Sequence, residues 1–118
     1  VSDNSLINTT DLFSTISELC GIENSDVFDS KSFAGVLNSN LSSNSRNYIY
    51  SELGNNEYAI RNSTHKYIHF EDGTEALFNL SVNEFERPNL LMQNQLPLSN
   101  NDSQNKDALI NELNQIRN

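Results

Sequence analysis

The chain has 118 residues, which is enough for one small domain, and its 7 basic and 16 acidic residues give a formal net charge of −9. This charge argues against nucleic acid or an anionic membrane as a partner, because both need a basic face. No apolar run approaches the roughly 18 residues of a membrane span, and the polar start VSDNSLINTT lacks the basic segment of a secretory leader. The single Cys allows neither an internal disulfide nor a cysteine zinc site.

A helix is predicted over residues 10–21, because its apolar residues recur at helical spacing. They form a single stripe of Leu12, Phe13, Ile16, Leu19 and Cys20. Cys20 is interpreted as a packed side chain, since a reactive thiolate needs a helix N-terminus or cationic neighbours. A short apolar segment over 31–37 is followed by a polar, low-complexity stretch over 38–45, which is the candidate boundary between two packing units.

From residue 46 to residue 80 the period changes to two, which predicts four β-strands over 46–53, 57–63, 65–71 and 75–80. The links are short, and the pair Asp72-Gly73 is a strong hairpin signal because a type I′ turn needs positive φ at both central residues. The strands are therefore expected to form an antiparallel meander. We expect one apolar face, made of Ile49, Leu53, Ile60, Ile68, Phe70, Phe78 and Leu80.

The alternation is lost over 81–95, where Pro88 suits the first turn of a helix. A last helix, capped by Asp102 or Ser103, is predicted to reach Arg117 and to cover the sheet. Its apolar stripe consists of Leu109, Ile110, Leu113 and Ile116. The expected fold class is α+β, with a four-stranded antiparallel sheet, a covering C-terminal helix and a preceding helical segment.

Residue patterns with catalytic or metal-binding chemistry are few. His65 and His69 are four residues apart on a predicted strand, roughly 13 Å, which is too far to share one ion, so both are interpreted as surface or edge histidines. The acidic residues lack the frame of a calcium loop and are interpreted as solvated turns. They are Asp26, Asp29, Glu71, Asp72, Glu75, Glu84 and Glu86. From the residues alone, we predict no catalytic residue and no metal ligand.

Several segments, in order, resemble the C-terminal part of the sulfatase family, within the alkaline-phosphatase-like superfamily. TTDLFSTISELCGI is similar to the family's "vDlfPTllelaGi", FDSKSFAGVL to "lDGrSllplL" and RNYIYSE to "r.yvysE". YAIRNSTHKYIHFEDGTEALFNLSVNEFERPNLL is similar to "yaiRt.ryKyi...dg.eeLYDLe.DP.EttNLa", and the end NELNQIRN to "l...L..lr". Together the matches cover nearly the whole chain.

The chain departs from this pattern at turns and caps. Ser14 stands where the family usually has Pro, and Ser30 where it has Gly. Asn79 replaces the Asp of "LYDL", and Asn83-Glu84 replaces "DP". These positions leave the fold assignment intact.

The resemblance implies an enzyme whose catalytic parts lie upstream of these segments. Sulfatases use a formylglycine, made from a C/S-x-P-x-R motif, and a calcium ion, but Cys20 is followed by neither Pro nor Arg in place. Both cofactors are thus implied for the parent enzyme and not for this chain, which is expected to be inactive alone. Arg61 and Lys66 match the family's "R....yK" pair. They are the candidates for contact with an anionic substrate or the domain junction, and the alternative is a structural pairing with a neighbouring carboxylate.

The resemblance therefore predicts the C-terminal segment of a sulfuric ester hydrolase, periplasmic or extracellular, with residues 1–45 ending a large α/β domain and 46–118 forming a sheet-and-helix subdomain. Its partner would be the rest of the parent sulfatase. Two alternatives stay open: a free-standing binding module, and the same part of a phosphodiesterase or phosphonate hydrolase. If the larger domain is missing, the stripe of the first helix is expected to find another cover, either on the sheet unit or by self-association through Leu12, Phe13, Ile16 and Leu19.

Overall fold

A computed structural model describes residues 3–22, 29–38, 46–54 and 56–118 of the chain. It separates into two compact units, Val1–Ile49 and Tyr50–Asn118. The predicted boundary over 38–45 falls almost entirely outside the described residues. The predicted division at 45 and 46, which concerns the domains of a parent enzyme, stays a prediction.

The N-terminal unit contains two helices, α1 (Asp11–Leu19) and α2 (Ala34–Leu37), which pack against each other. The predicted helix is confirmed with slightly narrower bounds, and Gly21, at φ 72°, follows its C-terminal end. Only glycine adopts such a positive φ at little cost, which explains why the helix stops there.

The apolar stripe of α1 faces away from the rest of its unit, and the expectation that the sheet unit or a second copy covers it stays a prediction. Between 50% and 58% of the surface of each of Leu12, Phe13, Ile16 and Leu19 is exposed. Cys20, interpreted from the sequence as packed, is exposed as well. The physical reason is that the inner face of the helix is occupied by polar residues, namely Asp11, Ser14 and Thr15.

The second unit is built on a sheet of four strands in the order β1-β2-β3-β4. The strands are β1 (Ile49–Leu53), β2 (Glu57–Arg61), β3 (His65–His69) and β4 (Glu75–Asn79). The β2–β3 and β3–β4 pairs are antiparallel, as the short links predicted. In the β3–β4 hairpin, Gly73 has φ 83° and its N–H donates to Phe70 O at 2.9 Å.

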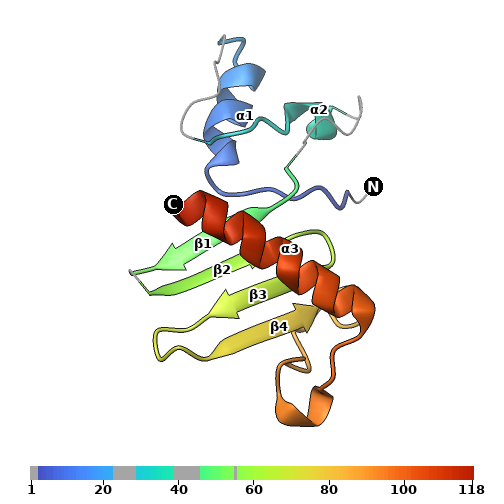
Figure 1. The fold of residues 1–118 in the computed structure, drawn as a ribbon. Coiled ribbons are helices and arrows are strands. Elements are labelled where there is room, and N and C mark those ends of the chain that lie inside the picture. The colour runs from blue at the N-terminus through green and yellow to red at the C-terminus, as the bar shows by residue number, and fades with distance from the viewer. Residues whose placement is uncertain (1–2, 23–28, 39–45, 55) are drawn as a thin grey trace. The chain divides into compact units, whose positions relative to one another are not determined.

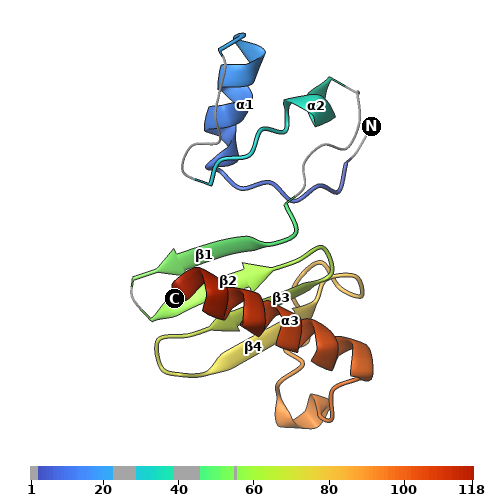
Figure 2. The same cartoon turned by 45° about the horizontal axis from the view of Figure 1, so that its top comes forward.

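Helix α3 (Asn100–Arg117) crosses one face of this sheet and packs on β3 and β2 (Figures 1 and 2). The core lies between them. It consists of Ile60, Tyr67 and Leu77 from the sheet and Leu109 and Leu113 from the helix, all buried. The α+β fold with a covering C-terminal helix is therefore confirmed.

The predicted apolar face of the sheet is wrong in its membership. Ile60 pairs with Tyr67, whereas Ile68 pairs with Ala59, so Ile60 and Ile68 lie on opposite faces. Paired residues share a face and consecutive residues alternate between faces. Tyr67, which is buried on the α3 side and was not among the predicted members, belongs to the core instead.

Helix α3 begins three residues before the predicted start. Ser99 is its N-cap, and the Ser99 hydroxyl accepts the N–H of Asp102, so Asp102 lies in the first turn and is not the cap. Pro88 begins no helix: the segment between β4 and α3 is irregular apart from the 3₁₀ turn η1 (Gln93–Gln95).

Asn89 fastens this irregular segment to the open edge of the sheet. Its Oδ1 accepts the N–H of Leu77 at 3.0 Å, and its Nδ2 donates to Glu75 O at 3.3 Å. The N–H of Leu90 donates to Leu77 O at 2.9 Å. The segment thus satisfies backbone groups of β4 that would otherwise be available for pairing with another strand.

Candidate functional site

The two sequence-predicted site residues are brought together by strand pairing. Arg61, at the end of β2, is the register partner of Lys66 on β3, so both side chains leave the same face of the sheet. Their neighbours Ile60 and Tyr67 are buried in the core under α3, which places Arg61 and Lys66 on the opposite face.

Lys66 already has a carboxylate partner. Its Nζ lies 2.7 Å from Oε1 of Glu86, in the segment that follows β4, with both side chains partly exposed. Arg61 uses its Nε on the carbonyl of Asn62 at 3.3 Å. Since the positive charge of Lys66 is compensated, Arg61 is the cation of this pair that is better suited to meet an anionic group.

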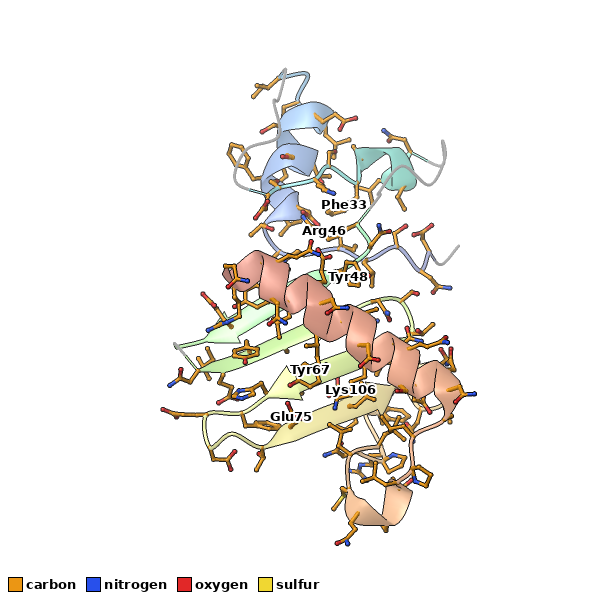
Figure 3. The ribbon with its side chains drawn as sticks, in the orientation of Figure 1. Phe33, Arg46, Tyr48, Tyr67, Glu75 and Lys106 are labelled. Atoms are coloured by element: carbon orange, nitrogen blue, oxygen red, sulfur yellow. The ribbon has the colours of Figure 1, made fainter. Side chains whose placement is uncertain are left out.

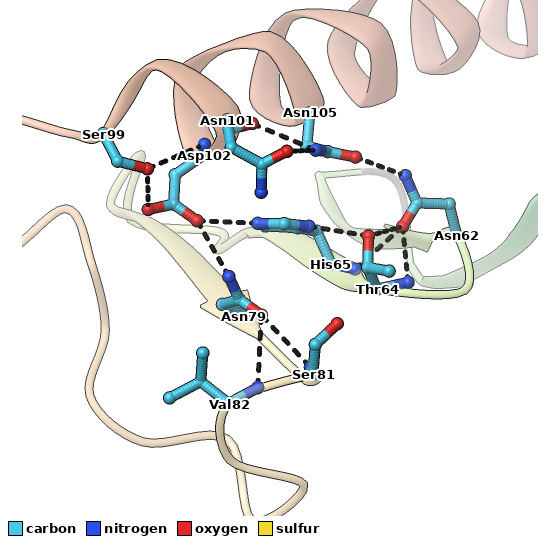
Figure 4. A network of polar contacts seen from close by, with 10 residues as sticks. All are labelled: Asn62, Thr64, His65, Asn79, Ser81, Val82, Ser99, Asn101, Asp102 and Asn105. Atoms are coloured by element: carbon cyan, nitrogen blue, oxygen red, sulfur yellow. Dashed lines mark hydrogen bonds and ion pairs between the residues drawn. The ribbon is translucent and has the colours of Figure 1, made fainter.

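A buried polar network, missed from the sequence, lies at the junction of α3 and the sheet (Figure 4). The Nε2 of His65 is 2.8 Å from Oδ1 of Asp102, and its Nδ1 is 2.8 Å from Oγ1 of Thr64. A carboxylate only accepts, so Nε2 carries the proton of this bond. Asn79 donates to the same oxygen of Asp102 at 3.0 Å, and the Ser99 hydroxyl donates to Oδ2 at 2.5 Å.

The interpretation of His65 as a surface or edge histidine is therefore wrong, because its side chain is completely buried. His69 is half-buried, stacked on Tyr58 with ring centroids 4.7 Å apart. The order hydroxyl–imidazole–carboxylate in Thr64, His65 and Asp102 has the connectivity of a catalytic triad. A fully buried imidazole cannot meet a substrate, however, so the network supports the fold.

The pKa of Asp102 reflects the balance within this network. Burial on its own would raise the pKa, but the hydrogen bonds from His65, Ser99 and Asn79 outweigh it, and the pKa lies below its ordinary value. Asp102 is therefore an ionised acceptor in the first turn of α3, where the helix dipole also favours a negative charge.

Tyr67 shows a second shifted pKa on the same side of the sheet. Burial and a hydrogen bond from its hydroxyl to Oε1 of Glu75, at 2.5 Å, raise the pKa of the phenol (Figure 3). The phenol thus stays protonated and acts as a donor to a neighbouring strand. This arrangement stabilises the β3–β4 pair and supplies no acid or base near neutral pH.

A shallow hollow of about 300 Å³ lies beside β1 and the end of α3, with Tyr50, Glu52, Gly54, Ile116 and Arg117 around it. Its polar groups bond to one another. Nη1 of Arg117 donates to the Tyr50 hydroxyl at 2.9 Å and to Oε2 of Glu52 at 3.3 Å, and the Tyr50 hydroxyl donates to Glu52. These mutual bonds hold the end of α3 on the sheet.

The sulfatase resemblance implies a calcium ion and a formylglycine for the parent enzyme. Within the described parts of the chain, no three His, Cys, Asp or Glu side chains are grouped to hold a metal ion. Cys20, at the end of α1, is followed by Gly21, Ile22 and Glu23, so the formylglycine motif is not present there.

None of the helices in the described residues is both long enough and apolar enough to span a membrane.

Solved structures similar to this chain include sulfatases. BT1596, a 2-O GAG sulfatase, matches with a TM-score of 0.67 and 22% identity, over 92% of this chain and 25% of its own. A protein from Bacteroides thetaiotaomicron assigned as a sulfatase matches with a TM-score of 0.65 and 24% identity, over 86% and 23%. BT4656, solved in complex with its substrate D-glucosamine-2-N,6-O-disulfate, matches with a TM-score of 0.66 and 18% identity, over 91% and 24%.

The fold is that of part of a sulfatase. The resemblance read from the motifs is confirmed at the level of the fold. The chain spans about a quarter of the length of the solved proteins it matches, which is consistent with a C-terminal sulfatase part. Neither the protein-family models nor the curated protein sequences give a match.

Proposed function

We propose that this chain forms the C-terminal part of a sulfatase-type sulfuric ester hydrolase, where it has a structural role and borders the substrate cleft. The observation that carries the proposal is the coverage: a sulfatase fold matches 92% of this chain and only 25% of the sulfatase. The nucleophile, the calcium ligands and the sulfate-binding residues belong to the remaining part. A sulfatase setting also favours a periplasmic or extracellular location.

The chemistry of ester hydrolysis supports the proposal that catalysis belongs to the remaining part of the enzyme and a structural role to this chain. Sulfate-ester cleavage needs an activated nucleophile and a cation that stabilises the departing charge. The buried imidazole of His65 and the compensated charge of Lys66 supply neither. We expect the 118-residue chain to turn over no chromogenic sulfate ester, whereas the whole encoded protein, carrying an upstream C/S-x-P-x-R motif, does.

Arg61 is our candidate for contact with the substrate. A charged hydrogen bond to a sulfate or carboxylate is worth about 1.5–3 kcal/mol, so Arg61→Ala in the whole protein should raise KM by about tenfold or more. Lys66→Ala should lower stability by breaking its pair with Glu86. Lys106→Ala, which removes a cation from α3 on the other side of the sheet, is the control.

The outcomes separate the alternatives. Turnover by the isolated chain, abolished by a substitution within it, would overturn the proposal. Turnover of a phosphodiester or phosphonate in place of a sulfate ester would assign the parent enzyme to the related hydrolases. A gene that encodes only these 118 residues would favour a free-standing binding module.

A further inference from the structure

The ring of His65 places a titratable group inside the contact between β3 and the first turn of α3 (Figure 4). Both ring nitrogens lie 2.8 Å from a polar partner, which is Oδ1 of Asp102 for Nε2 and Oγ1 of Thr64 for Nδ1. An imidazole ordinarily gains its second proton between about pH 5 and 8. A buried imidazole that cannot accommodate this proton makes a fold sensitive to acid. The contacts of Nδ1 therefore decide how this unit responds to mild acid.

In the neutral ring, Nδ1 is an acceptor. The carboxylate of Asp102 only accepts, which places the single ring proton on Nε2. Nδ1 then needs a donor, and the hydroxyl of Thr64 supplies one. Both polar atoms of the buried ring are thus satisfied, as buried polar groups require.

A second acceptor lies within reach of the Thr64 hydroxyl, because Oδ1 of Asn62 is 3.2 Å from Oγ1 of Thr64. The orientation of the Asn62 amide is fixed by its other bonds. Its Oδ1 accepts the backbone N–H groups of Thr64 and His65 at 2.9 and 2.7 Å. Its Nδ2 donates to Oδ1 of Asn105 at 3.0 Å. When the hydroxyl donates to Asn62, Oγ1 keeps a lone pair that can accept an N–H at Nδ1, so one rotation turns the partner of Nδ1 from a donor into an acceptor.

The charge of a doubly protonated ring would be compensated in place. Burial raises the pKa of Asp102, but the hydrogen bonds from His65, Ser99 and Asn79 outweigh burial and hold the pKa below its ordinary value. Asp102 therefore stays ionised in mild acid, in contact with Nε2. Buried charges are tolerated where they are both paired and hydrogen-bonded, and this site meets both conditions.

The other ionisable groups that flank the ring belong to three elements. On the side of the sheet that α3 covers, β4 presents Glu75, whose carboxylate accepts the Tyr67 hydroxyl, and β2 presents Tyr58, which is stacked on His69. On α3, Lys106 lies one turn after Asp102. The remaining groups are Asp107, Glu112 and Arg117 later in α3, and Glu57, Arg61 and Lys66 on the opposite face of the sheet. Among the described residues, Asp102 is the charged group bonded to the ring.

We propose that His65 is a proton-binding site inside the folded chain, which takes up a second proton on Nδ1 in mild acid while the ring stays buried. The proton comes from solvent, which reaches both ends of the network because Thr64 and Asp102 are partly exposed. The Thr64 hydroxyl turns from Nδ1 to Oδ1 of Asn62, and the bond to Asp102 becomes an ion pair. No covalent bond breaks, and the net charge of the unit rises by one. The network thereby keeps α3 on the sheet in acid that would open a fold with an unpartnered buried histidine.

Nitrogen-15 NMR of the 118-residue chain tests this proton uptake directly. The chain has two histidines, so His69→Gln leaves the ring signals of His65 alone. Between pH 8 and pH 5 we expect the Nδ1 signal to move from the position of an unprotonated ring nitrogen to that of a protonated one, while Nε2 stays protonated. Hydrogen exchange of the α3 amides, corrected for the intrinsic effect of pH, should change by less than about twofold between pH 7.5 and pH 5.5.

Substitutions at position 64 identify the hydroxyl as the cause. Thr64→Val has a similar shape but no hydroxyl, so a proton on Nδ1 would be a buried charged donor without an acceptor. We expect the protection of the α3 amides in this variant to fall by about tenfold or more between pH 7.5 and pH 5.5. Thr64→Ser retains the hydroxyl and should behave as the wild type.

Ser63→Ala is the control, because it removes an exposed hydroxyl from the same turn. Circular dichroism at pH 7.5 verifies that each variant is folded. A merely structural role of Thr64 would lower the protection equally at both pH values, so the ratio between them isolates the effect of the proton. If Thr64→Val does not fold, the titration of the wild-type ring decides.

Each outcome discriminates. A ring whose Nδ1 stays unprotonated down to pH 5 in the folded chain, or which carries both protons already at pH 8, would overturn the proton uptake. Loss of α3 protection in the wild type as His65 gains its proton would show that the ring is protonated only when the contact opens. Equal pH dependence of Thr64→Val and Thr64→Ser would overturn the role of the hydroxyl. None of these measurements involves turnover, so the proposed function stands or fails separately.

Discussion

Removal of the Asp102 carboxylate should clearly destabilise the sheet-and-helix unit, because this group accepts three side-chain hydrogen bonds. In Asp102→Ala, the buried imidazole of His65 loses its acceptor, which costs about 1–3 kcal/mol. Asn79 loses its acceptor as well, worth about 0.5–1.5 kcal/mol, and the first turn loses a favourable charge, worth about 0.3–1 kcal/mol. We therefore expect the free energy of unfolding to fall by about 2–5 kcal/mol, measured by urea denaturation.

Asp107→Ala is the matched control, because it removes the same charge from an exposed position of the same helix and should stay within about 0.5 kcal/mol of the wild type. A double variant sharpens the test. His65→Phe combined with Asp102→Leu removes both partners of the His65–Asp102 bond, so the buried imidazole donor is no longer left unpaired, and the double change should cost less than the sum of the single changes. Equal losses for Asp102→Ala and Asp107→Ala, or strict additivity in the double variant, would refute the assigned role of the network.

The lowered pKa of Asp102 predicts how the stability of the folded chain changes with pH. The pKa of Asp102 in the folded chain lies below its ordinary value of 3.8. A carboxyl with a lowered folded pKa contributes stability that is fully present above its unfolded pKa and is lost as the pH falls through the folded pKa. The stability difference between the wild type and Asp102→Asn should therefore persist from neutral pH to about pH 5, and should narrow below about pH 4.

Two further predictions concern the other polar anchors. Asn89→Ala should lower the free energy of unfolding by about 1–3 kcal/mol, because the N–H of Leu77 and the carbonyl of Glu75 lose their partner. Thermal denaturation measures this loss, and Asn83→Ala, which removes an amide side chain from an exposed turn, is the control. Asp11→Ala should cost about 3–5 kcal/mol, because it removes a buried carboxylate that accepts the N–H groups of Asn8 and Lys31 and pairs with Arg46. Hydrogen exchange of the α1 amides should detect this as a loss of protection in the N-terminal unit alone, and Asp3→Ala is the exposed control.

The sequence predicted the elements well, because period and turn chemistry are local properties. The change of period at residue 46 located the sheet, and Asp72-Gly73 located one hairpin. The register was not predictable in the same way, since a shift of one residue moves every side chain to the other face. The wrong placement of Ile68 beside Ile60 follows from that sensitivity.

The polar contacts were harder to predict, because they join residues distant in the sequence. His65 meets Asp102 across 37 positions, and nothing near either residue indicates the pairing. A local signal did exist for the start of α3: Ser99 followed three residues later by Asp102 is close to a capping box. Asn89 had no such signal, because its partners are backbone groups of another element.

The residues that carry the resemblance to sulfatases turn out to be hydrogen-bond anchors. Asp11 holds the start of α1, and Asn89 closes the sheet edge. Lys66 pairs with Glu86, and both stand at motif positions.

Residues that depart from the family pattern also form hydrogen bonds that hold the fold together. Pro has no N–H, so a Pro at position 14 would need no acceptor, whereas Ser14 has an N–H that is satisfied by Ser30, at the position where the family usually has Gly. Ser30 thus supplies the acceptor that the N–H of Ser14 needs. The motif residues Asp11, Lys66 and Asn89 hold neighbouring segments in place, as a structural part of a larger enzyme requires, and this supports the structural role that we propose.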